Sequence, residues 1–525
     1  MRQLISSLVV VSIISAGSLF SGPLQGTKTF SGMVRDERGR SLPGVLVQLI
    51  NTDRSISVSV MTSHEGRYYV DSLFPGTYDL RARGKGFEPS EKRGVLLDSR
   101  ASVDLILSRL KPGVVQTTSE DLYDQFPVAP GHELLADTCL RCHGRASLLE
   151  KRKTRESWQR TIELMAGYRH EDDVPAGVVD RLVNYFAKHF SADRPATPEF
   201  GGDQPEPPPS ELANVRITEY VIPDQGLPEK PVSSSNTAPI FPHNIIASPE
   251  GMIWFAMFQA NKIGRLDPRT GAFRSYPVPT PGSVPHGITV AQDGPIWFTE
   301  ARGSKVGMLD PKTGTIIEIP TNSGGNTIAP DSQGNMYLTM NRTNQIGRVN
   351  TKTRKSTAYD LLTPHAVPYG VIVDQKDQVW WTQLFGDSIG KLDPKTGLIT
   401  EYPTPTKPSG PRRLAVDQGG NIWFTEWVAG KIGKLDPTTG EITEYDLPSP
   451  AFEPYELCVD NEDAVWVSGF LSNTLARFDR ATGTFVEYPI PTPRSEIRKM
   501  TPDPKGGIWF AQSHTDTIGH IMVKR

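Results

Sequence analysis

The stretch PHGITVAQDGPIWFTEARGSKVGMLDPKTGTIIEIP, residues 285–320, determines the fold of most of the chain. It holds four short segments with β-type alternation, separated by Gly, Pro and Asp turn residues. Its central aromatic residue recurs at spacings of 40 or 43 residues, at Trp254, Trp297, Tyr337, Trp380, Trp423, Trp466 and Trp509. Four strands in a period of about 43 residues are typical of a propeller blade. Seven copies therefore predict a seven-bladed β-propeller over residues 214–525.

The two ends of the repeat array predict how the ring closes. Each copy has a small residue ten positions after its aromatic, and an ITEYP-type strand then follows in the first six copies. In the last copy this strand would fall beyond Arg525, whereas an unpaired ITEYVIP segment with Tyr220 precedes the first copy. We therefore expect the first strand of the array to complete the last blade, so that the ring has no open edge.

Residues 27–111 alternate as half-buried strands do, for example at the apolar pairs Val45/Val47 and Tyr78/Leu80. The motifs G-x-V-x-D, L-P-G-V-x-V, T-x-x-x-G-x-Y and L-x-P-G-x-Y resemble those of the carboxypeptidase regulatory-like domain. This resemblance implies a prealbumin-like β-sandwich. A spacer or docking module is the favoured role, with a carbohydrate-binding surface as the alternative.

Residues 126–192 change to a helical pattern and contain Cys139-Leu140-Arg141-Cys142-His143. C-x-x-C-H is the pattern of c-type haem attachment, in which two thiols add to the haem vinyl groups and the adjacent imidazole reaches the iron. A zinc half-site would need two more ligands, and the chain has no second cysteine pair. A redox dithiol would be expected in a βαβ setting. We therefore expect one covalent haem c on Cys139, Cys142 and His143.

The same segment continues with W-x-x-x-I-x-x-M, ending at Met165, and then with VNYFA. Together with C-x-x-C-H these motifs resemble a class I cytochrome c. The resemblance implies a small all-α module with His143 and Met165 as the two axial ligands of the haem iron. An ordinary core methionine is the alternative for Met165, and His170 and His189 are the substitute ligands.

The repeats themselves, with PHGITV, NIWFTEW and KIGKLDPTTG, resemble the virginiamycin B lyase (streptogramin lyase) family. The resemblance implies opening of a cyclic depsipeptide ester by elimination, with Mg²⁺ and a histidine base. That base is expected in a Glu-x-His motif of the last blade, with a metal-binding glutamate fourteen residues later. Here Glu496 matches, but Arg498 and Gln512 replace the other two positions. An arginine cannot act as the base at neutral pH, and an amide binds Mg²⁺ more weakly than a carboxylate does.

Shared repeat offsets predict which residues surround the central channel. Eleven residues before the blade aromatics stand His243, His286, Asn326, Tyr369, Arg412, Tyr455 and Arg498. Three residues after them stand Met257, Glu300, Met340, Gln383, Glu426, Gly469 and Gln512. We expect both rings at one channel mouth, as a binding face. The candidate catalytic residues are His286, Glu300, Glu496 and Arg498. For each single residue a structural role is favoured over a catalytic one, with Glu300 paired to His286 and Glu426 to Arg412.

The remaining features concern export and partners. Residues 1–22 have a charged start and an apolar run, typical of a secretory signal peptide, with an uncleaved membrane anchor as the alternative. Residues 193–213 are expected to form a Pro-rich linker. The net charge of −3 provides no basic field for nucleic acid. Three cysteines make a disulfide framework improbable, and Cys458 is expected to be a buried free thiol.

The sequence thus predicts a mainly β multidomain protein: signal peptide, β-sandwich, all-α haem module, linker and propeller. The favoured function is that of a bacterial c-type cytochrome, exported to the periplasm or secreted, which transfers electrons while the propeller binds a substrate or redox partner protein. Streptogramin B lyase-like ring opening and a non-catalytic carbohydrate- or peptide-binding sensor remain as alternatives. An enzymatic role as an oxidoreductase component stays open, because the catalytic positions of the lyase family are largely replaced.

Overall fold

The computed structural model describes residues 28–111, 118–123, 125–135, 138–141, 143–149, 151–166, 177–194, 203–212, 214–223 and 239–524. The predicted signal peptide lies outside these residues, as do Cys142 and His170. Within the described part of the chain, no helix has the length and apolarity needed to cross a membrane.

The N-terminal part is a β-sandwich. Its strands are β1 (Lys28–Asp36), β2 (Leu46–Asn51), β3 (Ile56–Met61), β4 (Arg67–Leu73), β5 (Gly76–Arg83), β6 (Ser90–Leu97), β7 (Arg100–Ser102) and β8 (Leu105–Leu107). One sheet contains β4, β1 and β7, with β8 also paired to β1, and the other has the order β3-β2-β5-β6. The alternating residues predicted to face inward do so, since Val45, Val47, Tyr78 and Leu80 are all buried in one cluster.

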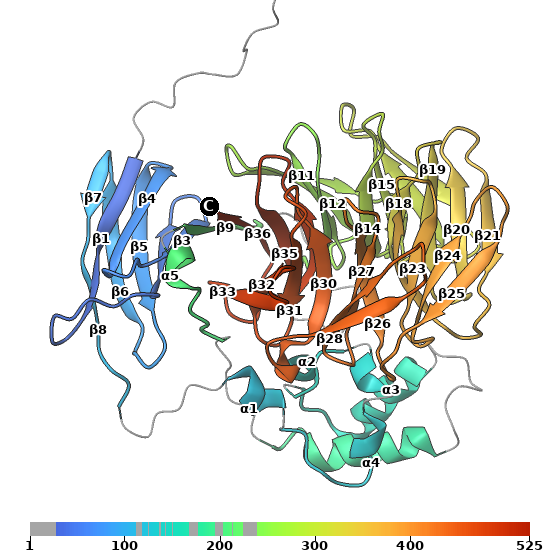
Figure 1. The fold of residues 1–525 in the computed structure, drawn as a ribbon, viewed down its shortest axis with the longest axis horizontal. Helices are drawn as coiled ribbons and strands as arrows, with labels where there is room; N and C mark the ends of the chain where they lie inside the picture. The colour runs from blue at the N-terminus through green and yellow to red at the C-terminus, as the bar shows by residue number, and fades with distance from the viewer. Residues whose placement is uncertain are drawn as a thin grey trace, which may run out of the picture.

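The propeller consists of seven four-stranded blades (Figure 1). The strands of each blade follow in order from the channel outward. Blade one has β10 (Pro242–Ala247), β11 (Ile253–Met257), β12 (Lys262–Asp267) and β13 (Ala272–Pro277), and blade two has β14 (Pro285–Val290), β15 (Ile296–Glu300), β16 (Lys305–Leu309) and β17 (Ile316–Pro320). Blade three has β18 (Ile328–Pro330), β19 (Asn335–Met340), β20 (Gln345–Asn350) and β21 (Ser356–Asp360), and blade four has β22 (Pro368–Val373), β23 (Val379–Gln383), β24 (Ser388–Leu392) and β25 (Ile399–Pro403). Blade five has β26 (Pro411–Val416), β27 (Ile422–Glu426), β28 (Lys431–Leu435) and β29 (Ile442–Asp446), and blade six has β30 (Pro454–Val459), β31 (Val465–Gly469), β32 (Thr474–Asp479) and β33 (Thr484–Pro489). Blade seven has β34 (Ile497–Pro502), β35 (Ile508–Gln512), β36 (Thr517–Val523) and β9 (Val215–Val221).

The small residue of each repeat is explained by the packing of two neighbouring strands. In blade five, Gly433 on β28 pairs with Phe424 on β27, and a Cβ on Gly433 would lie 2.2 Å from the Phe424 ring. In blade six the small residue is Ala476, and its partner is Val467 instead of an aromatic. Glycine is thus required under the Phe424 ring, and alanine fits beside the smaller Val467.

The predicted closure of the ring is confirmed. Strand β9 pairs antiparallel with β36, and Tyr220 lies opposite Ile518, as Tyr276 lies opposite Ile263 in the first blade. The Tyr220 ring is 6.0 Å from that of Trp509, so it supplies the aromatic contact that the last repeat lacks in its own sequence.

The sandwich continues the sheet of the last blade, which the sequence did not predict. Strand β3 pairs with the free edge of β9, which creates one sheet of eight strands running from β34 to β6 (Figure 1). Beside this junction, Gln48 Nε2 and the Ser57 hydroxyl each donate to Glu219 Oε2 at 3.2 Å. Both edges of β9 are therefore hydrogen-bonded, which joins the two parts of the chain firmly.

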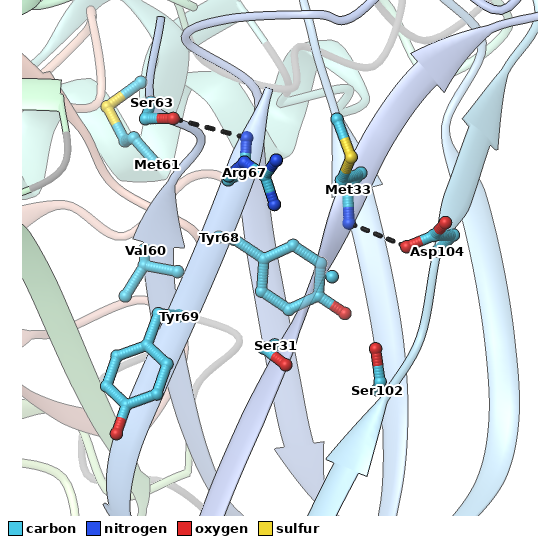
Figure 2. Close-up of a pocket in the computed structure, with 11 residues that line it drawn as sticks. Ser31, Met33, Val60, Met61, Ser63, Arg67, Tyr68, Tyr69, Ser102 and Asp104 are labelled. Carbon is cyan, nitrogen blue, oxygen red and sulfur yellow. Dashed lines mark hydrogen bonds between the residues drawn. The ribbon is translucent and has the colours of Figure 1, made fainter. Parts of the chain in front are cut away.

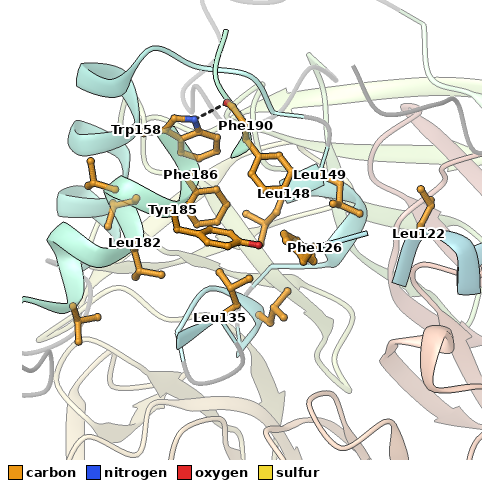
Figure 3. Packing of buried hydrophobic residues seen from close by; sticks show 14 of the residues in the cluster. Leu122, Phe126, Leu135, Leu148, Leu149, Trp158, Leu182, Tyr185, Phe186 and Phe190 are labelled. Atoms are coloured by element: carbon orange, nitrogen blue, oxygen red, sulfur yellow. Dashed lines mark hydrogen bonds between the residues drawn. The ribbon is translucent and has the colours of Figure 1, made fainter. Parts of the chain in front are cut away.

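Short helices lie below the propeller in Figure 1. They are α1 (Ser119–Tyr123), η1 (His132–Leu134), η2 (Cys139–Arg141), α2 (Arg145–Leu149), α3 (Arg155–Ala166) and α4 (Val178–His189). Their apolar faces form one cluster around Trp158, Tyr185 and Phe186 (Figure 3). Ala451 and Leu471 from propeller loops belong to the same cluster. The helical segment therefore has a core of its own that extends onto the propeller.

The linker expectation needs a correction for residues 203–212. This stretch includes α5 (Pro209–Leu212), and Leu212 is buried against Leu46 and Met61 of the sandwich. Glu211 forms an ion pair with Arg477 at 2.5 Å. The stretch is thus packed in place rather than a spacer, because Leu212 provides an apolar anchor that the proline content obscures.

Candidate functional site at the channel mouth

The C-x-x-C-H segment lies directly on the propeller. Arg141, between the two cysteines of the motif, is buried and donates from Nη1 to the Leu384 carbonyl at 3.0 Å. It also forms an ion pair with Asp387 at 3.2 Å and lies over the Phe385 ring. The motif is therefore fixed to the loop after β23 through an arginine that cytochrome chemistry does not itself need.

Further contacts of the segment lead to the inner strands. Trp427 Nε1 donates to the Leu140 carbonyl at 2.5 Å, and Arg412 Nη1 donates to the Arg141 carbonyl at 3.2 Å. On the other side of the motif, Arg145 forms an ion pair with the buried Glu453 at 3.0 Å. Leu140, Arg141 and Arg145 thus contact three neighbouring blades, through Trp427, Asp387 and Glu453.

Cys139 and His143, two of the residues predicted to bind haem, lie close together. Cys139 is half-buried beside the apolar cluster, and the His143 amide donates to the Cys139 carbonyl at 2.9 Å, which brings both side chains into one helical turn. Burial, followed by the positive charges of Lys151, Arg498 and Arg412, lowers the pKa of His143 to about 3. The imidazole is therefore neutral, which is the form that binds iron.

The other predicted iron ligands lie on α3 and α4. Met165 is half-buried in the last turn of α3, where its side chain remains a candidate ligand. His189 is half-buried at the end of α4, with its ring 5.0 Å from that of Tyr185. Burial, Lys188 and Arg194 lower the pKa of His189, so this imidazole too is neutral near pH 7.

The first predicted ring converges at the mouth. The rings of His243 and His286 are 3.9 Å apart, and the hydroxyls of Tyr369 and Tyr455 are 2.7 Å apart. The Arg412 guanidinium lies over both tyrosines, at 4.9 and 4.2 Å from their ring centroids. A shared repeat offset therefore located residues that meet across several blades.

The histidines of this ring are uncharged. Burial is the main cause that lowers the pKa of His286 to about 3 and the pKa of His243 well below its usual value. His286 Nδ1 is 2.7 Å from the Asn326 carbonyl oxygen. Asn326 precedes the short strand β18 and contributes this backbone oxygen to the ring.

Glu496 and Arg498, the last two candidates, form an ion pair at 2.8 Å. Arg498 Nη1 also donates to the Tyr455 hydroxyl at 3.2 Å. His514 Nδ1 approaches Glu496 to 4.0 Å, and the sequence reasoning missed this residue. It follows Gln512 by two positions, so the loop after β35 was the available signal.

The second predicted ring does not line the mouth. Gln383 Nε2 donates to Glu401 Oε1 at 2.6 Å, and Gln512 Nε2 donates to Glu219 Oε1 at 2.7 Å. Each contact stays within one blade and joins its second strand to its outermost one. The expectation that this ring shares the binding face was wrong, because strand alternation directs these side chains into the blade.

Glu300 and Glu426 occupy the same position in blades two and five. Both are fully buried, and burial together with the charges of Glu318 and Glu444 raises the pKa of Glu300 to about 7 and that of Glu426 to about 8. Their neighbours are therefore the outer-strand glutamates. The alternative pairing with His286 and Arg412 is not found. Cys458 is a buried free thiol, as expected.

A separate groove of about 540 Å³ lies on the sandwich (Figure 2). Polar groups of Ser31, Ser102 and Asp104 line it, and Tyr69 is 61% exposed. The groove combines hydroxyls with an exposed aromatic ring. It is the place on the sandwich where a polar ligand would be sought.

Comparison with known proteins agrees with this architecture. Residues 221–478 match the Virginiamycin B lyase family, and residues 29–108 match the Carboxypeptidase regulatory-like domain. The propeller has a virginiamycin B lyase-like fold. No curated protein matches the chain.

Three solved structures are similar to the propeller. Virginiamycin B lyase from Staphylococcus aureus is 27% identical with a TM-score of 0.53, and the match covers 59% of this chain and 100% of that one. A streptogramin B lyase structure is 28% identical with the same TM-score, covering 59% and 98%. A catalytically inactive Staphylococcus aureus virginiamycin B lyase with quinupristin is 26% identical with a TM-score of 0.53, covering 59% and 100%.

The Mg²⁺ expected from this resemblance lacks a matching set of side chains. Within the described residues, no group of three or more His, Cys, Asp or Glu side chains is arranged to hold a metal ion. At the positions of the last blade, Arg498 is paired with Glu496 and Gln512 with Glu219. These residues do not fit a divalent cation.

Proposed function

We propose that this protein is an exported bacterial c-type cytochrome whose haem module is fixed on the channel mouth of a lyase-like propeller. Cys139 and Cys142 would form the thioethers, and His143 and Met165 would be the axial ligands. The C-x-x-C-H motif carries the proposal, and the contacts of Leu140, Arg141 and Arg145 with Trp427, Arg412 and Glu453 support its placement beside the inner ring. The propeller would then bind a redox partner protein or a small-molecule substrate.

Bound haem supplies one-electron chemistry, and the chain controls its surroundings. The buried contacts of Arg141 and Arg145 hold the motif in one orientation. The apolar cluster around Trp158 and Phe186 excludes water, which favours a stable low-dielectric environment. The signal-like residues 1–22 support export to the periplasm or secretion. Haem is attached to c-type cytochromes outside the cytoplasm, so export is consistent with the proposal.

A redox titration tests this proposal. We expect protein produced by cells that mature c-type cytochromes to change its visible spectrum reversibly on reduction and reoxidation. In Met165→Ala the midpoint potential should fall, because a methionine ligand raises it. Met308→Ala is the matched control. Met308 lies on β16 of blade two, and its replacement should leave the potential unchanged. A wild-type spectrum that does not respond to reductant would contradict the proposal.

The second candidate is a streptogramin B lyase-like activity, favoured by the family match over residues 221–478. It predicts Mg²⁺-dependent ring opening of quinupristin that survives in Cys142→Ala. The residue at the position of the expected histidine base, Arg498, is paired with Glu496. We expect no turnover, and turnover independent of haem would favour the lyase over the cytochrome.

A further inference from the structure

The second and fourth strands of a blade are joined by a polar pair that differs between blades. In blade four, Gln383 on β23 donates from Nε2 to Glu401 Oε1 on β25 at 2.6 Å. In blade five, Glu426 and Glu444 occupy the equivalent positions, so that one carboxyl group faces another. Blade seven has the first type of pair, Gln512 with Glu219, and blade two has the second, Glu300 with Glu318.

The inner carboxyl of each glutamate pair has no donor from which to accept. Glu300 and Glu426 are fully buried, and among the residues that the structure describes neither receives a hydrogen bond on either oxygen. The Ser283 hydroxyl, which faces Glu300, donates to Asn261 Oδ1 instead, at 3.0 Å. A buried carboxylate without donors is costly, whereas a neutral carboxylic acid can donate to the facing carboxylate as the glutamine amide does. The repeat geometry therefore favours a bound proton in these two blades.

The outer glutamate of each pair also holds the loop that enters its blade. Glu318 accepts from the Thr280 amide and hydroxyl, both at 2.8 Å. Glu444 accepts in the same way from Thr406, at 2.8 and 2.6 Å. The two threonines lie in the loops that lead into β14 and β26, the inner strands of blades two and five. A negative charge gained by the inner glutamate therefore acts on the group that fixes the loop.

In blade two a lysine balances part of the charge. Lys305 Nζ is 2.7 Å from Glu318 Oε2. Burial, followed by the charge of Glu318, raises the pKa of Glu300 to about 7, although Lys305 acts in the opposite direction. Above this pH the lysine faces two carboxylates instead of one, and the pair loses its hydrogen bond.

In blade five the surroundings are more negative. Lys431 forms its ion pair with Asp446, and Asp387 in the loop after β23 adds negative charge near Glu426. Burial, followed by the charge of Glu444, raises the pKa of Glu426 to about 8. Loss of the proton then places two like charges side by side, and one of them is buried. The pair of blade five therefore holds its proton to a higher pH than that of blade two.

We propose that each glutamate pair is a pH-sensitive switch, which fixes its entry loop while the pair shares one proton and loosens the loop when the proton is lost. The loops concerned are residues 279–284 before β14 and residues 405–410 before β26. The strands that follow carry His286 and Arg412 of the inner ring, so the switch acts on the channel mouth in these two blades. It requires neither haem nor a bound ligand.

Pulse-labelling hydrogen exchange of the full chain tests the switch, at about pH 6 and about pH 8.5, with rates corrected for the intrinsic effect of pH. In the wild-type protein, peptides covering the two entry loops should exchange at least about threefold faster at the higher pH. Residues 362–367 of blade four are the internal control, because Thr363 is held there by Glu401 beside Gln383. Their exchange should not change.

Substitutions exchange the two types of pair. Glu300→Gln and Glu426→Gln should each remove the pH effect in its own loop and leave the other loop as in the wild type. Gln383→Glu should create the effect in residues 362–367. Circular dichroism establishes that each variant is folded. If Gln383→Glu is unstable, the two glutamine variants still decide the question, because they reproduce a pair that the fold already contains.

Infrared spectroscopy measures the proton itself. The wild-type protein should contain neutral carboxylic acid at about pH 6 that is lost by about pH 9 and is missing from Glu300→Gln/Glu426→Gln. The proposal is overturned if this neutral carboxyl is absent at the lower pH. It is equally overturned if the corrected exchange of both entry loops is the same at the two pH values.

Discussion

Gly433 and Phe424 pack so closely that an added methyl group would disturb the pairing of β27 with β28. A Cβ at position 433 would lie 2.2 Å from the Phe424 ring. We predict that Gly433→Ala lowers the free energy of unfolding by about 1–3 kcal/mol, because the ring must move. Adding Phe424→Val reproduces the Val467/Ala476 pair of blade six and should recover part of the loss. Chemical denaturation of the single and double variants measures this, and strictly additive losses would contradict the packing argument.

Glu426 should make stability depend on pH. Its pKa is about 8 in the folded protein, against an ordinary value of 4.5. Between these values the folded state holds a proton that the unfolded state releases, so stability falls as pH rises, by at most about 1.4 kcal/mol per pH unit. Glu426→Gln imitates Gln383 and should stabilise the protein at about pH 8.5 by about 1–2 kcal/mol, with little change at about pH 4.5. Thermal unfolding at both pH values checks this; equal shifts at both would refute it.

The first ring and Glu426 show what repeat offsets can and cannot predict. His243, His286, Tyr369 and Tyr455 were correctly brought together, because equivalent positions of a closed ring lie at one height. Glu426 was misplaced, because an offset does not say which face of a strand a side chain occupies. Strand alternation did contain that information, since Glu426 lies two residues after Phe424 and so shares its face.

The helical segment is held on the propeller by a small number of polar contacts. Glu453 is 2% exposed at its side chain, and its ion pair with Arg145 would leave a buried charge if broken. Arg145→Gln should therefore lower the local opening free energy of residues 138–149 by about 1–3 kcal/mol. Hydrogen exchange followed by mass spectrometry measures this directly.

Arg160→Gln provides the control, because Arg160 is exposed on α3. It should leave exchange in residues 138–149 unchanged. Equal exchange in both variants would mean that the Arg145–Glu453 pair does not hold the segment in place.

The elements were predictable where their neighbours are close in sequence or fixed by the repeat. The blades and the closing strand follow from the 43-residue period and from the last repeat, which lacks its fourth strand before Arg525. The pairing of β3 with β9 and the contacts of Leu140, Arg141 and Arg145 with the propeller did not follow. Both join segments far apart in sequence through edges and buried polar groups, which leave no periodic signal.

At the scale of the molecule, the sandwich, the helical segment and the propeller form one connected structure. The eight-stranded sheet joins the sandwich to the last blade, and the apolar cluster of Figure 3 joins the helices to the propeller. Haem chemistry and the inner ring would therefore belong to one site. A fixed arrangement of this kind would favour electron transfer between the proposed haem and a ligand or partner at that mouth.

The intact mass of the purified protein, after acidic organic extraction, tests this account most directly. Material from cells that mature c-type cytochromes should retain the mass of one haem, and Cys139→Ala/Cys142→Ala should not. A wild-type mass equal to that of the polypeptide alone would contradict the central claim and leave the propeller without its redox role.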